Sequence, residues 1–223
     1  DGRRFLCGIL TRPEVYFGVF FYPVGGFFME KSVLNKNVKI AMLSAVSALL
    51  MYVDIPLWFA PPFYKIDLSE VAVMIGAFAL GPGAGVFIEL FKIVLILLIK
   101  GTTTGFVGEA ANFIIGCSFV LPAAIIYQKC KTKKSAIIGM ATGTAVMTAI
   151  GCVINAFVLI PAYAAAFKMP LDAIIALGTK VNSGINSLAT LVLFATAPFN
   201  ILKGILVGII TCLLYKRVRF ILK

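Results

Sequence analysis

The sequence predicts an all-α integral membrane protein, a compact bundle of six transmembrane helices. Three observations predict it. The 223-residue chain is 61% hydrophobic, its mean hydropathy is +1.04, and only 13% of its residues are charged. Its apolar runs approach the length of about 20 residues that a membrane-spanning helix needs. A soluble globular domain would show a far more polar composition.

The first 28 residues differ from the rest of the chain. They begin at Asp1 and combine Arg3 and Arg4 with an aromatic, glycine-rich stretch. This stretch has neither the long apolar run nor the small-residue cleavage site of a signal peptide. We expect residues 1–28 to be an atypical leader, either disordered or an upstream extension, and residues 29–223 to form the six-helix transmembrane domain.

Six helices are expected in order along the rest of the chain. The first covers about 38–53, and a loop with Pro56, Pro61 and Pro62 separates it from a short second helix at about 69–80. Apolar runs predict the third to sixth helices at about 82–99, 106–128, 135–160 and 186–215. The connection from 161 to 185 is expected to lie over the outer surface.

Basic residues fix the expected orientation. The net charge of +11 would suggest a nucleic-acid partner in a soluble protein, but here it is concentrated beside the apolar runs, which excludes that interpretation. With six spans, three clusters fall on the same side, which is therefore cytoplasmic together with both termini. The clusters are Lys31, Lys36 and Lys39; Lys129, Lys131, Lys133 and Lys134; and Lys216, Arg217, Arg219 and Lys223.

Four polar residues interrupt the apolar runs: Asn112, Asn155, Asn200 and Lys203. A lone amide or ammonium in hydrocarbon is unfavourable by several kcal/mol unless something pairs with it, so such positions are functional candidates. A rise of about 1.5 Å per residue places all four in the outer half of the membrane. We therefore expect a pocket for a polar, neutral small molecule that opens outward. The structural alternative is that these groups only pair internally, for example Lys203 with Glu109.

Further candidates flank this set. Glu109 shares a helix face with Asn112, although its place in a first helical turn is explained by the helix dipole alone. Tyr64 and Asp67 lie in the first outer loop, within reach of a ligand or water. Glu89 and Lys92 are three residues apart and are expected to form a structural ion pair.

Small residues recur at four-residue spacing, which lets helices approach closely. The pairs are Ala41 and Ala45, Gly81 and Gly85, Gly139 and Gly143, and Gly204 and Gly208. Most are expected to pack within the bundle. Ala41 and Ala45, near the cytoplasmic side of the first helix, are candidates for contact with another membrane subunit.

The sequence argues against an enzyme, a cofactor and a metal site. It has no histidine, its five cysteines show no CxxC spacing, and it lacks a GxxxxGK[ST] phosphate loop. Nucleophilic and metal-dependent catalysis therefore have little material, and the chain is not expected to hydrolyse ATP.

Four segments together resemble a known family. They are 65–70 (KIDLSE), 76–85 (GAFALGPGAG), 105–113 (GFVGEAANF) and 198–204 (PFNILKG). They are similar to the substrate-binding S components of energy-coupling factor (ECF) vitamin transporters, and most similar to the riboflavin-specific branch. The resemblance spans about residues 36–220.

The resemblance implies a function and partners. It implies a multi-pass subunit of a bacterial cell membrane that binds riboflavin from outside and works with a transmembrane coupling subunit and two ATPase subunits. Asn155, Asn200 and Lys203 would match the polar contacts to the flavin, and the first outer loop would assist. Ala41 and Ala45 would match the face that meets the coupling subunit.

The residues leave two alternatives open. One is an S component for another vitamin: the carboxylate of biotin would suit Lys203, whereas cationic thiamin is disfavoured beside a lysine. The other is a proton-coupled carrier or a membrane enzyme that uses Glu89 or Glu109.

Overall fold

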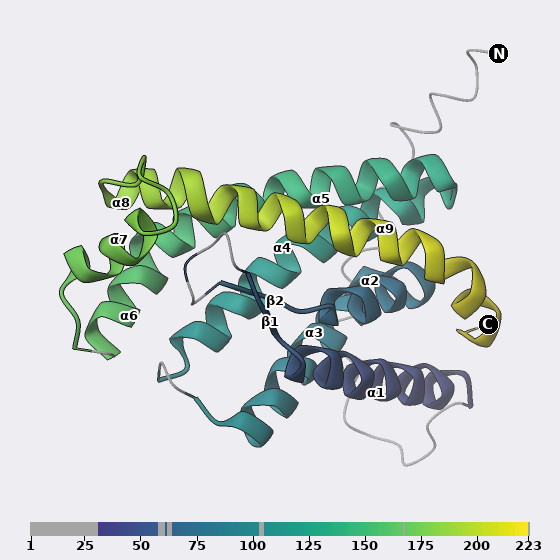
Figure 1. The fold of residues 1–223 in the computed structure, drawn as a ribbon. Helices are drawn as coiled ribbons and strands as arrows, with labels where there is room; N and C mark the ends of the chain where they lie inside the picture. The colour runs from purple at the N-terminus through teal and green to yellow at the C-terminus, as the bar shows by residue number, and fades with distance from the viewer. Residues whose placement is uncertain (1–30, 58–60, 62–63, 103–104, 167, 223) are drawn as a thin grey trace, which may run out of the picture.

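A computed structural model of the chain describes residues 31–57, 61, 64–102, 105–166 and 168–222, and the expected leader at 1–28 lies outside them. The described part is a helical bundle (Figure 1). Its first four helices are α1 (Lys31–Tyr52), α2 (Ser69–Leu80), α3 (Pro82–Lys100) and α4 (Val107–Cys130). Each corresponds to a helix expected from the sequence.

The last two predicted helices are longer and less regular than expected. One runs without interruption through α5 (Lys133–Ile154), a π-helical turn η2 (Asn155–Leu159) and α6 (Ile160–Ala166). The other runs through α8 (Leu188–Leu191), a second π-helical turn η3 (Val192–Thr196) and α9 (Ala197–Leu222). Between them, α7 (Leu171–Thr179) is a helix where only a connection was expected.

A small hairpin joins α1 to α2. Strand β1 (Ile55–Pro56) pairs antiparallel with β2 (Lys65–Ile66), with Ile55 opposite Ile66 and Pro56 opposite Lys65. Asp54 tightens this hairpin because its carboxylate lies 3.0 Å from Lys65 Nζ and 3.6 Å from Lys100 Nζ. The hydrogen bond to Lys65 is the main cause that keeps the pKa of Asp54 below its ordinary value.

Glycines allow the helices to pack closely. A Cβ added to Gly139 of α5 would come within 2.7 Å of the Ala123 carbonyl oxygen of α4, and one on Gly85 of α3 within 2.7 Å of the Ala77 side chain of α2. Gly204 of α9 likewise faces Thr144 of α5. Gly81 differs from this expectation: it ends α2 at φ +105 with no atom near its missing Cβ.

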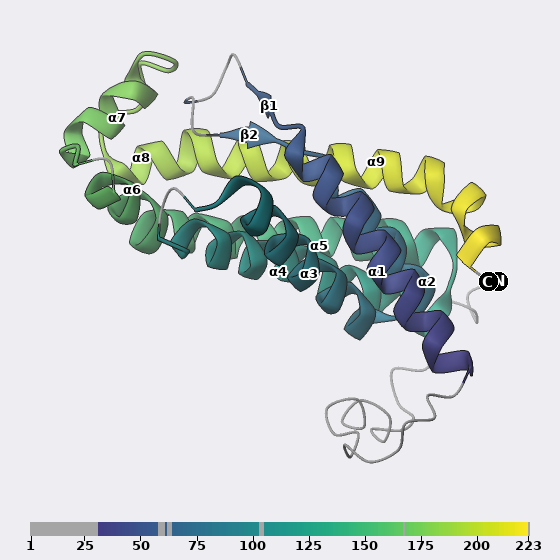
Figure 2. The same cartoon turned by 90° about the horizontal axis from the view of Figure 1, so that it is seen from below.

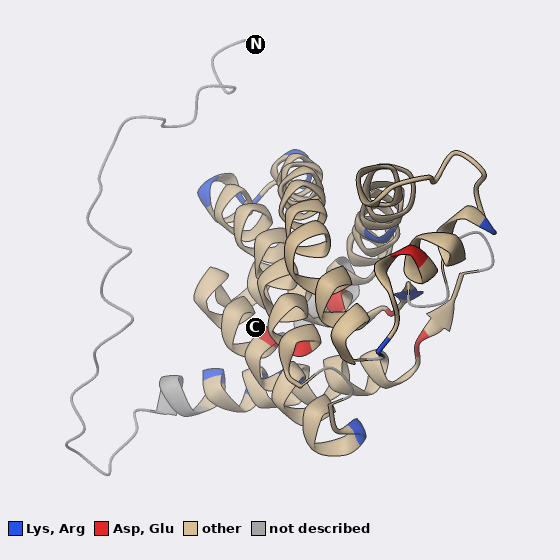
Figure 3. Cartoon of the chain, turned by 90° about the vertical axis from the view of Figure 1, so that its left-hand side faces the viewer, with Lys and Arg blue, Asp and Glu red and all other residues tan. Residues whose placement is uncertain are grey.

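The two ends of the bundle differ. The start of α1, the α4–α5 turn and the end of α9 lie at one end, α6 and α7 lie at the other, and the hairpin lies between them (Figures 1 and 2). Seen from the α6–α8 end, acidic ribbon segments lie within the ring of helices as well as near its edge (Figure 3). Charged groups therefore enter the interior of an otherwise apolar bundle.

Length and composition single out 4 membrane-capable helices among the described residues: Pro82–Lys100, Val107–Cys130, Lys133–Ala166 and Leu188–Tyr215. The expected number of six spans is not confirmed. Helix α2 has 12 residues, fewer than a span needs, and α1 begins with a polar turn that holds Asn35, Lys36 and Asn37. The all-α, membrane-spanning class agrees with the sequence prediction.

Candidate functional site

A cavity of about 170 Å³ lies beside the β1–β2 hairpin, whose Lys65 is one of its lining residues. It brings together residues from the segment between α1 and α2, from α4, from the η2–α6 segment and from α9. All the predicted ligand residues line it except Glu109. The lining residues are Tyr64, Lys65, Asp67, Gly108, Asn112, Ile115, Asn155, Leu159, Tyr163, Phe199, Asn200 and Lys203.

Lys203 and Asp67 form the charged part of this cavity. Lys203 Nζ donates to Asp67 Oδ2 at 3.1 Å, and both side chains are largely buried. Burial raises the pKa of Asp67, but the charges of Lys203 and Lys92 and the hydrogen bonds from Ser69 outweigh it, so the net pKa lies well below its ordinary value. The carboxylate therefore stays ionised, and the pair adds no net charge to the cavity.

Asn200 is the least satisfied polar residue of the cavity. It is 3% exposed, and its Nδ2 has no hydrogen-bond partner among the described residues. A buried amide donor without a partner is unfavourable by about 1–3 kcal/mol. Asn200 also lines the cavity.

Asn155 is already engaged on both sides of its amide. Its Oδ1 accepts from the Tyr64 hydroxyl at 3.2 Å, and its Nδ2 donates to the Gly151 carbonyl at 2.8 Å. Tyr64 also contacts the Thr196 hydroxyl. A phenol donates only one hydrogen, so Thr196 donates to Tyr64 when Tyr64 donates to Asn155.

An aromatic wall closes one side of the cavity. The Tyr64 and Phe199 rings lie 4.9 Å apart between centroids with an interplanar angle of 36°. Burial raises the pKa of Tyr64 to about 12, although the hydrogen bond with Thr196 acts in the opposite direction. The phenol is therefore neutral at physiological pH and remains a hydrogen-bond donor.

The two π-helical turns help to shape the site. Asn155 is the first residue of η2, and Thr196 is the last residue of η3, four positions before Asn200. A π-helical turn accommodates one extra residue and is frequent at functional sites. Here η2 begins with a cavity-lining amide, and η3 ends four positions before another.

Asn112 and Glu109 differ in their placement. Asn112 of α4 lines the cavity, half-buried, with Met51 Sδ 4.0 Å from its Nδ2. Glu109 accepts from Thr102 Oγ1 at 3.1 Å and does not line the cavity. Lys203 therefore pairs with Asp67 and not with Glu109, the partner that the sequence suggested as an example.

A buried ionic cluster lies near the cavity. Lys92 Nζ of α3 is 2.8 Å from Glu70 Oε1 of α2 and 2.6 Å from Glu89 Oε1 of its own helix, and all three side chains are at most 1% exposed. The expected Glu89–Lys92 pair is thus confirmed, with Glu70 as an additional member. Gly116 of α4 faces the Glu89 carboxylate, and a larger residue there would collide with it.

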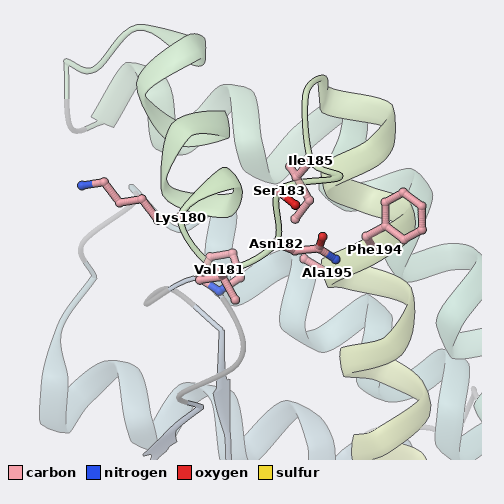
Figure 4. A pocket seen from close by; sticks show the side chains of 8 residues that line it. Lys180, Val181, Asn182, Ser183, Ile185, Phe194 and Ala195 are labelled. Carbon is pink, nitrogen blue, oxygen red and sulfur yellow. The ribbon is translucent and has the colours of Figure 1, made fainter.

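A second, larger cavity of about 480 Å³ contains none of the predicted site residues. The segment after α7 forms one wall, and η3 forms another (Figure 4). Its lining residues are Pro61, Lys180, Val181, Asn182, Ser183, Ile185, Phe194 and Ala195. In the close-up, the Lys180 side chain extends away from the other labelled side chains.

Sequence reasoning missed several residues of the first cavity. Phe199 has no polar group, and an aromatic residue in a membrane helix is ordinarily assigned to lipid or to packing. Tyr163 falls in the connection expected from 161 to 185. Phe199 does precede Asn200 within the segment 198–204, which is the one local signal that was available. Ser69, which holds Asp67, was not singled out.

Comparison with known proteins identifies similar chains. Residues 35–215 match the family model described as "ECF transporter, substrate-specific component". The "Riboflavin transporter RibU" of Staphylococcus aureus (strain TCH60) is 37% identical over 190 residues, which cover 85% of this chain and 93% of that protein. The "Riboflavin transporter FmnP" of Bacillus subtilis (strain 168) is 33% identical over 187 residues, covering 83% and 93%.

A solved structure agrees with these relatives. It is described as "Structure and mechanism of the S component of a bacterial ECF transporter" and superimposes with a TM-score of 0.65 at 34% sequence identity. The match covers 85% of this chain and 98% of that one.

Proposed function

This chain belongs to the substrate-specific components of ECF transporters, and from that membership we propose that it captures riboflavin outside the cell for delivery inward. The family consists of transporter components and not of enzymes. The observation that carries the proposal is the unpartnered Asn200 donor beside Lys203 in a cavity with an aromatic wall. A flavin offers ring carbonyls and nitrogens to such donors and a flat ring to aromatic side chains.

The charge of the site favours riboflavin over biotin. Lys203 alone would attract a carboxylate, but Asp67 at 3.1 Å already neutralises it. A carboxylate ligand would have to compete with Asp67 for the ammonium and would meet its negative charge. A neutral ligand such as riboflavin takes the remaining N–H donors of Lys203 without disturbing the pair.

The size of the cavity predicts a movement on binding. Ligand pockets usually enclose about 300–1,000 Å³, and the cavity of about 170 Å³ is smaller. Tyr64 and Asp67 reach it from the segment that contains the β1–β2 hairpin, whereas Asn155, Asn200 and Lys203 belong to long helices. We infer that the hairpin moves outward to admit the ligand.

Membrane topology and partner subunits complete the proposal. Residues 29–223 form one transmembrane unit with six spans, α2 included, and both termini in the cytoplasm. The basic residues near the α4–α5 turn support this orientation. Delivery depends on a transmembrane coupling subunit and two ATPase subunits, since the chain has no phosphate loop of its own. Ala41 and Ala45, both exposed on α1, form part of the face for the coupling subunit.

Purified protein in detergent tests the ligand directly. We expect it to quench riboflavin fluorescence stoichiometrically, and we expect unlabelled biotin or thiamin at tenfold excess not to release the flavin. The same measurement is made on variants of four cavity residues: Asn112, Asn155, Asn200 and Lys203. A protein that leaves flavin fluorescence unchanged but retains labelled biotin would contradict the riboflavin proposal and leave the family assignment intact.

A further inference from the structure

We propose that Ser69, which does not line the cavity, is a positioning residue for Lys203 and acts through the Asp67 carboxylate. This inference rests on the proposed function, that the cavity binds riboflavin. It concerns what holds the ammonium in place for the ligand.

Both oxygens of Asp67 are occupied. Oδ2 accepts from Lys203 Nζ at 3.1 Å, while Oδ1 accepts from the Ser69 backbone N–H at 2.9 Å and from the Ser69 hydroxyl. A carboxylate held at one oxygen has little freedom to turn about its axis. The position of Oδ2, and with it that of Lys203, therefore depends on Ser69.

The direction of the Ser69 hydroxyl is fixed by a neighbouring ammonium. Lys92 Nζ lies 3.4 Å from Ser69 Oγ. An ammonium has donors only, so Ser69 Oγ accepts from Lys92 and its own hydrogen is left to donate to Asp67. Lys92 thus sets the polarity of the bond that holds the carboxylate.

Ser69 is itself well fixed. It is 1% exposed, and its carbonyl oxygen accepts from Ser47 Oγ of α1 at 2.9 Å. Lys92 is held between Glu70 and Glu89, which are on α2 and α3. The chain of contacts Lys203–Asp67–Ser69–Lys92 therefore connects α9 with the packing of α1, α2 and α3.

A simpler interpretation is that Asp67 and Ser69 only form a local turn at the start of α2. The backbone bond from Ser69 alone would fit that interpretation. The ion pair to Lys203, which is 136 positions away in the chain, does not belong to a local turn. The two interpretations predict different effects on riboflavin affinity when the Ser69 hydroxyl is removed.

A double-mutant cycle separates them. Riboflavin affinity is measured by fluorescence quenching for wild type, Ser69→Ala, Lys203→Gln and the double variant. We expect Ser69→Ala to weaken binding about tenfold, equivalent to about 1.4 kcal/mol. In the Lys203→Gln background the same change should alter affinity less than about twofold, because coupled residues are not additive. Ser44→Ala is the matched control, a buried serine whose hydroxyl donates to the Ile40 carbonyl of its own helix.

The double-mutant cycle can overturn the proposal in two ways without touching the proposed function. One is an equal loss from Ser69→Ala in both backgrounds; the other is wild-type affinity in Ser69→Ala. If Lys203→Gln binds too weakly to measure, the vibrational spectrum of bound riboflavin decides. We expect Ser69→Ala, but not Ser44→Ala, to shift the flavin carbonyl bands, and an unshifted spectrum with weaker binding would also overturn it. A wild-type protein that binds no riboflavin rejects the proposed function itself, and the positioning role with it.

Discussion

The side chain of Asn200 lies directly against Gly151: a Cβ on Gly151 would come within 2.7 Å of Asn200 Nδ2. The same glycine gives its carbonyl to Asn155 Nδ2 at 2.8 Å. One position on α5 therefore supports two of the three central amides of the site. Its lack of a side chain is a requirement of the cavity rather than of helix packing alone.

Gly151→Ala is expected to weaken riboflavin binding about tenfold. The new methyl group would turn the Asn200 amide away, and the proposed hydrogen bond from Asn200 to the ligand, worth about 1–1.5 kcal/mol, would be lost. The atom in conflict is the end of a side chain, so the backbone need not move and folding should be retained. Fluorescence quenching measures the affinity. Gly208→Ala is the control, because the nearest atom to its Cβ is Met140 Sδ at 3.8 Å. Equal affinity in both variants would disprove the relationship.

Asn200→Ala is expected to weaken riboflavin binding with little effect on stability, whereas Asn155→Ala is expected to lower stability. Among the described residues Asn200 Nδ2 has no partner to lose, so Asn200→Ala should leave the stability of the ligand-free protein within about 1 kcal/mol while binding falls at least tenfold. Asn155→Ala removes the bonds to Tyr64 and Gly151 and should lower stability by about 1–3 kcal/mol. Thermal unfolding in detergent without riboflavin measures the difference. The reverse order of stabilities would count against the hydrogen-bond assignment.

Tyr64 predicts a loss of stability at high pH. Its pKa is raised from 10.0 to about 12 in the folded protein, mainly by burial. The contribution of Tyr64 to folding stability is therefore complete below pH 10, where the phenol is protonated in both the folded and the unfolded protein. It declines between about pH 10 and 12, because the unfolded protein loses this proton first. Unfolding midpoints from pH 9 to 11.5 should fall more steeply for wild type than for Tyr64→Phe. Parallel curves would show that Tyr64 does not titrate in this way.

Glu89→Gln is expected to preserve both folding and riboflavin affinity within about twofold. Glu89 contacts Lys92 Nζ at 2.6 Å, but neither of its oxygens accepts a hydrogen bond from the part of the chain that the structure describes, and Glu70 remains as the partner of Lys92. Lys92→Met should instead be strongly destabilised, by about 3–5 kcal/mol, because two carboxylates lose their buried counter-ion. Expression and thermal unfolding test both variants. Loss of riboflavin uptake in a stable Glu89→Gln protein would favour a proton-coupled carrier.

Ala41→Trp and Ala45→Trp are expected to abolish riboflavin uptake by cells without changing the affinity of the isolated protein. Both alanines are exposed on α1, so the larger side chain fits the subunit itself and obstructs only a partner. Ile137→Trp is the control, an equally apolar position of α5 that is 58% exposed. Uptake of labelled riboflavin is compared with binding in detergent. Normal uptake by both α1 variants would place the coupling subunit elsewhere.

The sequence predicted the helices and most of the candidate cavity for a physical reason. Polar groups in apolar runs are unfavourable unless they converge, so Asn112, Asn155, Asn200 and Lys203 could be expected to share one site. The structure brings all four to one cavity. The expectation for Glu109 rested on its spacing from Asn112, but a side chain in the first turn can bend back toward the preceding loop, here to Thr102.

Other features had no local signal. The pairing of Lys203 with Asp67 joins residues 136 positions apart and follows from the tertiary fold. The π-helical turns at 155–159 and 192–196 leave no mark in composition, since Val, Leu and Phe suit a regular helix in a membrane equally well. Helix α7 is 9 residues long, so periodicity in the predicted outer connection was too brief to identify it.

The Lys203–Asp67 pair also has an electrical consequence. The energy of a lone ammonium moved across the membrane would change by about 2.3 kcal/mol for every 100 mV of membrane potential. Because Asp67 accompanies Lys203 at 3.1 Å, the pair has no net charge, and a neutral vitamin adds none. The membrane potential would therefore exert no net force on this pair or on a neutral molecule bound beside it.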